Sequence, residues 1–260
     1  MSKIKNIISK LFKRTPNATD APRYTNIKQA CEEIMQRFIE GKPGWRYLKT
    51  KRTFSYKIPK GAFVDIYTAM SNKSDFVTFQ FSIQVGHKEI GKAMEMIYNM
   101  KDTTNWIVGI NGLSWAPKNV SHGRCILFQP RPEFLTNFEQ ARKDGSTSYV
   151  YLNEFEERLA ILFTAAEKKI TEIFDTTSEI ALINSIIEKP IGYFDPVSVL
   201  VVQLMLDNPA YYDELVDFYD RPHEELVALK IDMLNQQHAD MAMARYRDGT
   251  LPKFSFINNG

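Results

Sequence analysis

The amino-acid sequence predicts an α+β fold: a mostly antiparallel β-sheet in the N-terminal half, packed by helices, followed by a helical C-terminal half. Two observations support this prediction. Between residues 45 and 128 apolar residues recur mainly with a period of two, whereas after residue 133 they recur with helical spacing. Strands therefore come first and helices later, an order typical of α+β proteins and unlike an alternating strand–helix pattern.

The first residues predict an amphipathic helix over 2–14, because apolar and basic side chains fall on opposite arcs. The apolar arc holds Ile4, Ile7, Ile8, Leu11 and Phe12, and the basic arc holds Lys3, Lys5, Lys10, Lys13 and Arg14. Prolines at 16 and 22 indicate a linker. A second helix is expected from Asn26 to Glu40, where Gly41 ends it.

The sheet is expected from segments rich in aromatic and β-branched residues: Trp45–Ile58, Ala62–Met70, Asp75–Val85, Cys125–Phe128 and a short piece at Ser148–Leu152. In the third segment apolar and polar residues alternate, so one face of the sheet should be solvated. A helix is expected at Lys88–Met100. Asn111-Gly112, between two apolar runs, predicts a two-residue hairpin turn because both residue types tolerate positive φ.

The helices of the second half are expected at Glu133–Lys143, Glu154–Phe174, Thr177–Glu188, Val197–Leu206, Tyr211–Tyr219 and Pro222–Arg247. Proline near the start of the last helix and Gly249 just beyond its end are the usual boundary signals. The predicted organisation is a basic helix and linker (1–22), a sheet region (23–152), a helical region packed with it as one unit (153–248) and an irregular tail (249–260).

Charge is distributed unevenly along the chain. Residues 1–60 carry 15 basic and 4 acidic side chains, and residues 151–260 carry 9 and 19, although the whole chain has a net charge of only +2. Such asymmetry bears on partners and association rather than on fold.

Cys31 and Cys125 are the only cysteines, so neither a disulfide framework nor a zinc site is expected. No apolar run is long enough to span a membrane. We therefore expect a cytoplasmic protein, with peripheral contact at the inner membrane surface through residues 2–14 as an alternative.

No catalytic residues, cofactor, metal site or small-molecule ligand is predicted. Residues 86–92 match the glycine-rich phosphate loop up to Lys92. Ala93, however, replaces the hydroxyl residue that would bind magnesium, and Glu89 would place a carboxylate in the phosphate cradle. His223 and His238 both fall on the last predicted helix. They lie too far apart along that helix to share one metal ion.

Residues 45–60 interleave aromatic side chains with lysines and arginines. Such a strand could stack bases and neutralise phosphates, which makes nucleic acid a possible partner. The alternative is a two-faced strand with aromatics in the core and lysines that protect the sheet edge.

An acidic, tyrosine-rich segment at residues 207–225 is the preferred binding surface. Tyrosines beside carboxylates suit a basic protein partner for two reasons. The rigid rings bury surface area in the interface, and the negative charges attract the approaching basic partner. The alternative is a solvated helix face with its aromatics turned inward. The predicted partner-binding residues are Asp207, Tyr211, Tyr212, Asp213, Glu214, Asp217, Tyr219 and Asp220.

The order of elements in residues 24–187 resembles a family of uncharacterised bacterial domains of unknown function. The shared features are an opening helix, basic-aromatic strands with a Gln-rich strand (VTFQFSIQV), and a Trp-bearing segment (NWIVGI). That resemblance implies no catalytic residues. In physical type the acidic tyrosine helix is similar to the binding surfaces of bacterial immunity proteins that neutralise basic nuclease toxins. The leading hypothesis is thus a non-catalytic, immunity-type interaction protein. A membrane-peripheral protein and an enzyme with an unrecognised site are the alternatives.

Overall fold

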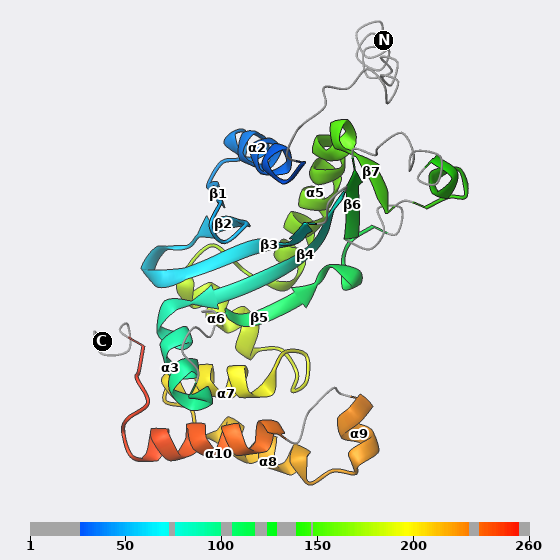
Figure 1. The fold of residues 1–260 in the computed structure, drawn as a ribbon. Coiled ribbons are helices and arrows are strands. Elements are labelled where there is room, and N and C mark those ends of the chain that lie inside the picture. The colour runs from blue at the N-terminus through cyan, green and yellow to red at the C-terminus, as the bar shows by residue number, and fades with distance from the viewer. Residues whose placement is uncertain are drawn as a thin grey trace, which may run out of the picture.

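The computed structural model describes residues 27–72, 76–99, 106–117, 124–128, 139–146, 148–228 and 234–254. These residues form an α+β protein, as the sequence predicts (Figure 1). The predicted membrane-contact helix at 2–14 lies outside the described residues, as do residues 255–260 of the predicted tail.

Among the described residues, seven strands form one sheet. They are β1 (Trp45–Leu48), β2 (Thr53–Lys57), β3 (Ala62–Asn72), β4 (Phe76–His87), β5 (Trp106–Asn111), β6 (Arg124–Phe128) and β7 (Tyr149–Tyr151). Neighbours from β1 to β4 are antiparallel. β5 and β6 both pair antiparallel with the remaining edge of β4, at opposite ends of that strand, and β7 runs parallel to β6. The long strand β4 is therefore the centre of the sheet.

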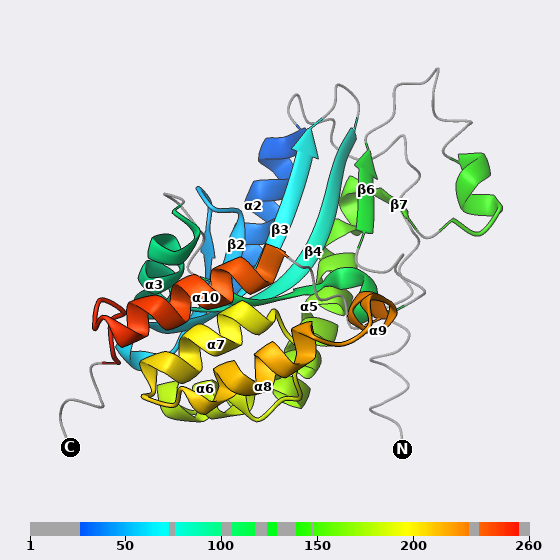
Figure 2. The same ribbon diagram turned by 90° about the horizontal axis from the view of Figure 1, so that it is seen from below.

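The two faces of β4 differ as the alternating pattern predicts. Val77, Phe79, Phe81, Ile83 and Val85 are buried on the face that packs against helices. On the other face the side chain at 80 is exposed, those at 78 and 82 are half-buried, and Gln84 is buried, so this face is solvated only in part. Figure 2 looks onto this second face, with α2 and α5 behind the sheet.

The longer described helices are α2 (Ile27–Glu40), α3 (Lys88–Tyr98), α5 (Phe155–Ile173), α6 (Glu179–Ile187), α7 (Pro196–Met205), α8 (Ala210–Tyr219), α9 (His223–Ala228) and α10 (Leu234–Arg247). Short 3-10 turns are η1 (Pro59–Gly61), η2 (Gly112–Ser114) and η4 (Leu152–Glu154). α7 is buried along its whole length, and α3, α6, α8 and α10 contact it. It is thus the central helix of the C-terminal half (Figures 1 and 2).

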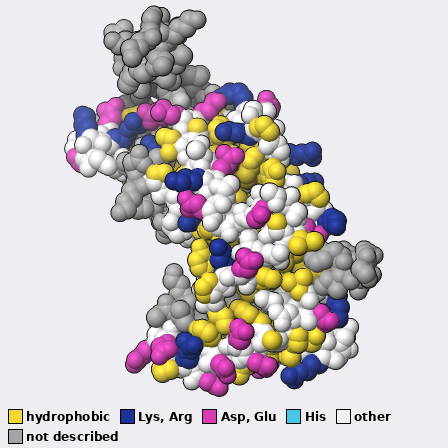
Figure 3. All heavy atoms as spheres, turned by 180° about the vertical axis from the view of Figure 1, so that it is seen from behind, with side chains coloured by type: hydrophobic (Ala, Val, Ile, Leu, Met, Phe, Trp, Pro, Cys, Tyr) yellow, Lys and Arg dark blue, Asp and Glu magenta, His cyan; other side chains and the backbone are white. Residues whose placement is uncertain are grey.

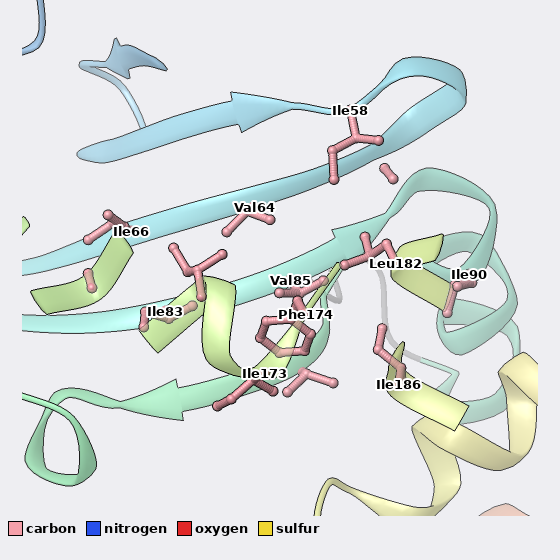
Figure 4. Packing of buried hydrophobic residues seen from close by; sticks show 14 of the residues in the cluster. Ile58, Val64, Ile66, Ile83, Val85, Ile90, Ile173, Phe174, Leu182 and Ile186 are labelled. Carbon is pink, nitrogen blue, oxygen red and sulfur yellow. The ribbon is translucent and has the colours of Figure 1, made fainter. Parts of the chain in front are cut away.

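The core joins the sheet to these helices. Figure 4 shows Ile173 and Phe174, at the end of α5, and Leu182 of α6 packing toward Ile83 and Val85 of β4. Apolar side chains from both halves of the chain therefore share one cluster, which agrees with the predicted packing of the helices on the sheet as one unit.

A second part of the core is aromatic. The ring of Phe163 on α5 lies 5.4 Å from that of Phe38, 5.5 Å from that of Phe54 and 5.0 Å from that of Trp45. The three pairs meet edge to face, a favourable geometry for aromatic rings. This cluster fixes α5 and α2 on the first two strands.

Three local predictions are wrong. The segment Trp45–Ile58 is not one strand, because a turn at residues 49–52 divides it into the antiparallel pair β1 and β2. Asn111-Gly112 does not form a hairpin turn, because Gly112 begins η2 and its carbonyl accepts hydrogen bonds from the backbone N–H groups of Trp115 and Ala116. The Ser114 hydroxyl also donates to the Asn111 carbonyl, at 2.7 Å. The single helix predicted at 222–247 is instead the pair α9 and α10, which point in different directions (Figure 1). The direction of α10 follows from its packing along α7.

Candidate interaction surface

The spacing of residues on α8 divides the helix into a buried and an acidic face. Tyr211, Leu215 and Tyr219 recur every fourth residue and are all buried. Asp213, Glu214, Asp217 and the following Asp220 are exposed. These four carboxylates are called the acidic face of α8 below.

No ion pair joins the acidic face of α8 to a cation within the part of the chain that the structure describes. The nearby cation Arg221 lies over the ring of Phe218, 3.8 Å from its centroid, and pairs with Glu225 at 3.8 Å. In Figure 3, acidic side chains gather at the lower end of the molecule, the end that α8 and α10 form in Figure 1. The carboxylates of the acidic face of α8 therefore lie exposed without an ion pair to a described cation.

Asp207, predicted to belong to this surface, has partners within the chain. Its carboxylate accepts hydrogen bonds from Lys253 Nζ at 2.7 Å and from the Tyr246 hydroxyl at 2.9 Å. The bond from Lys253, followed by that from Tyr246, lowers the pKa of Asp207. We therefore leave Asp207 out of the interaction surface.

The tyrosines are not the exposed anchors that the sequence predicts. Tyr211 and Tyr219 are only 7% and 6% exposed, because they lie on the stripe of α8 that faces the core. Burial, followed by nearby carboxylates, raises the pKa of both phenols. Tyr212 is half-buried and its hydroxyl donates to Asp240 Oδ1 on α10 at 2.7 Å. The inward-facing alternative is correct for these rings, and the acidic face contributes mainly charge.

A deeply buried ionisable pair among the described residues was not predicted. His87, at the end of β4, and Glu179, at the start of α6, are 0% and 4% exposed, and Nε2 lies 2.6 Å from Oε1. His87 Nδ1 accepts a hydrogen bond from the Glu89 backbone N–H at 3.1 Å, so the ring proton lies on Nε2 and donates to the carboxylate. The edge-to-face ring of Phe254, 5.4 Å away, covers the imidazole. The pair thus has a structural role, because it links the sheet, α3, α6 and the C-terminal segment.

The phosphate-loop pattern and the described histidines lie in regular elements or pack against aromatic rings. Gly86 lies in β4, which ends at His87, and Gly91 is buried inside α3, so residues 86–92 form a strand end and a helix rather than a loop. The ring of His238 packs 4.2 Å from that of Tyr98, and the side chain of His223 lies outside the described residues. In the described ranges no three His, Cys, Asp or Glu side chains are grouped so as to hold a metal ion. Burial also raises the pKa of the Cys31 thiol to about 12, which keeps it protonated at neutral pH.

The basic-aromatic strands turn their rings inward. Tyr47 and Phe54 are buried with centroids 5.3 Å apart, and Trp45 and Tyr56 are half-buried beside them. The basic side chains at 46, 49, 51 and 57 are exposed. This agrees with the alternative of a two-faced strand whose lysines protect the sheet edge, because the rings that would stack on bases pack against the core.

Comparisons of the chain with protein families, curated proteins and solved structures find no match. Among the described helices, none has the length and apolar character needed to cross a lipid bilayer.

Proposed function

We propose that this protein is a non-catalytic interaction protein whose acidic face of α8 binds a basic protein partner. The observation that supports the proposal is the contrast between these four exposed carboxylates, with no cation partner among the described residues, and Asp207, which Lys253 neutralises. Exposed charge of one sign speeds encounter with a surface of opposite sign and suppresses binding to acidic surfaces. An immunity-type role, in which the partner is a basic toxin, is a narrower form of this proposal.

The acidic face lies on a rigid support. α8 contacts the buried helix α7 and also α10, and its three buried residues hold its orientation. A partner would therefore meet carboxylates at fixed spacing, which favours specific over diffuse electrostatic attraction.

The proposal is tested by capture of partners from a lysate of the native host on immobilised full-length protein. We expect one basic protein to be retained stoichiometrically at low salt and released as salt is raised, because exposed charge pairs are screened. The Asp213→Asn, Asp217→Asn variant should retain much less of it. The Glu157→Gln, Glu188→Gln variant, which removes one exposed charge from α5 and one just after α6, should retain it normally. Recovery of the chain without a stoichiometric partner, or equal retention by both variants, would contradict the proposal.

A further inference from the structure

The outer edge of β5 is an open edge of the sheet. One edge of this strand pairs antiparallel with β4, from Val108 opposite Val85 to Asn111 opposite Ser82. Among the described residues no strand pairs with the other edge, which lies on the side of α7 (Figure 1). The backbone N–H and C=O groups along an unpaired edge can form a ladder with one more strand.

A cavity of about 590 Å³ follows this edge. Four consecutive residues of β5, Val108–Asn111, line it. Consecutive side chains of a strand point to opposite faces of the sheet, so a cavity that contacts all four residues lies along the edge of the strand and not above one face. The far wall is the segment 192–196, which leads into α7, and Lys169 and Ile173 of α5 line it as well. The volume is within the range of roughly 300–1,000 Å³ that is usual for ligand sites.

One side of the cavity is apolar. Val108 and Ile110 lie on the apolar face of β5, because their partners across the ladder are buried core residues of β4. The other apolar side chains that line this part of the chain's surface are Ile173, Phe194 and Pro196. A strand placed beside β5 would therefore cover apolar surface with every second side chain.

The opposite side of the cavity has space for a side chain. Gly109 is exposed on the second face of the sheet, and a Cβ atom added there would meet no atom within 4 Å. Side chains directly opposite each other on neighbouring strands are in contact. A large side chain on an added strand could therefore lie over Gly109.

The two charged side chains that line the cavity have partners within the chain. The Asp195 carboxylate accepts hydrogen bonds from the backbone N–H and the hydroxyl of Ser198, at 2.8 and 2.6 Å. The Lys169 ammonium pairs with Glu172 at 3.4 Å. The groups that remain for recognition are thus the strand edge and the apolar lining, which suit a peptide better than a charged small molecule.

A second copy of this chain does not suit the edge. Four residues extend over only about 13 Å, and the wall formed by residues 192–196 stands opposite them. A stable interface between two proteins buries more than about 1,000 Å², which a short edge within a cavity does not offer to a folded sheet. A single extended chain can enter the same space.

We propose that this cavity binds an extended segment of another protein, which pairs with β5 as an added strand. Two alternate apolar side chains of the segment lie against Val108, Ile110 and the apolar lining, and a large side chain between them lies over Gly109. Backbone pairing supplies affinity in this mode of recognition, and alternate side chains supply specificity. The proposal does not depend on the acidic face of α8.

The direct test is an NMR titration of the full-length protein with the blocked peptide acetyl-Ser-Val-Tyr-Val-Ser-amide. The control is acetyl-Val-Val-Tyr-Ser-Ser-amide, which has the same composition without the alternation. We expect saturable shifts of backbone amides in β5 and in residues 192–196 with the first peptide only. Alternate amides of β5 should also exchange hydrogen more slowly, because only every second N–H points to the added strand. Equal shifts with both peptides, or binding without slower exchange, would overturn the proposal.

A glycine substitution tests the contact over Gly109. The wild type should bind the tyrosine peptide about threefold more tightly than its alanine-centred analogue, as expected for a cross-strand side-chain contact. Gly109→Val fills the space without a clash and should abolish that preference. Gly41→Val, at a glycine that likewise has no atom within 4 Å of an added Cβ, is the matched control and should keep it. The same preference in both variants would place the peptide elsewhere.

Analytical ultracentrifugation of the full-length protein without peptide tests the alternative occupant. We expect a monomer at the concentrations used for NMR. A dimer that the peptide dissociates would identify a second copy as the occupant of the edge and would contradict the proposal.

Discussion

Glu179 on α6 and the carboxylates of α8 belong to the same acidic half of the chain but differ in burial and in their hydrogen-bond partners. Glu179 on α6 is buried, and a histidine from a distant strand donates a hydrogen bond to it. Asp213 and Asp217 on α8 are exposed, and the described residues provide no cation for them. Burial of a charge demands a partner inside the protein, whereas exposure leaves water to solvate it. Only the second kind of carboxylate is available to another molecule, so the acidic composition of this half does not by itself define a binding surface.

The largest effect should follow from breaking the buried pair. His87→Ala removes the donor to Glu179 and the acceptor at the start of α3, and leaves a carboxylate unpartnered in the interior. We expect the free energy of unfolding to fall by about 3–5 kcal/mol, measured by urea denaturation. Glu179→Gln, which keeps an acceptor for Nε2–H, is the control and should lose much less. A loss below about 1 kcal/mol for His87→Ala would show that the pair is not important for stability.

A smaller effect of opposite sign is expected at Asp65 on β3. This carboxylate is 6% exposed on the second face of the sheet, and burial raises its pKa above the ordinary value of 3.8, partly offset by a hydrogen bond from Ser55. When the folded-state pKa of a carboxyl group is raised, its ionisation disfavours the folded state. Asp65→Asn should therefore raise the free energy of unfolding at pH 7 by on the order of 1 kcal/mol.

The pH dependence of this gain follows from the same shift. The advantage of Asp65→Asn should be full above the raised pKa of Asp65. It should shrink as the pH falls through that pKa toward 3.8, because wild-type Asp65 then becomes neutral in the folded state. Urea denaturation of both proteins across this range checks the trend. An advantage that stays constant with pH would mean that the desolvated charge is not its cause.

The smallest effect on stability is expected on the acidic face of α8. Asp213→Asn with Asp217→Asn should change the free energy of unfolding by less than about 0.5 kcal/mol, as is usual for exposed positions without partners. The measurement is again urea denaturation at neutral pH. A larger loss would reveal contacts of these carboxylates that stabilise the fold, and would weaken their assignment to a binding surface.

Periodicity was sufficient to predict most elements of the fold. The alternation in residues 76–85 predicted the strand and its apolar face, whereas the polar face is solvated only in part because Gln84 is buried. Helical spacing predicted α2, α5, α6, α7 and α8 closely. Local signals failed where a distant or competing interaction decides the conformation. Gly112 starts a 3-10 turn instead of completing a hairpin, and α10 follows the direction of α7.

The candidate sites were only partly predictable, because their key contacts join residues far apart in sequence. The exposed carboxylates of α8 could be read from the helical spacing. The same spacing places Tyr211 and Tyr219 on the buried face, but the sequence does not say which face is covered. Lys253 neutralises Asp207 from 46 positions away, and His87 meets Glu179 across 92. No pattern in the sequence indicates either pair.

The most direct test of the central claim is the association rate between the captured basic partner and two charge-reversed variants, measured at low and moderate salt. Asp213→Lys with Asp217→Lys should slow association about tenfold or more at low salt and weaken its salt dependence, because the steering charge is inverted. Glu157→Lys with Glu188→Lys changes the net charge equally and should leave the rate nearly unchanged. If both variants slow association to the same extent, net charge rather than the acidic face of α8 governs binding, and the claim fails.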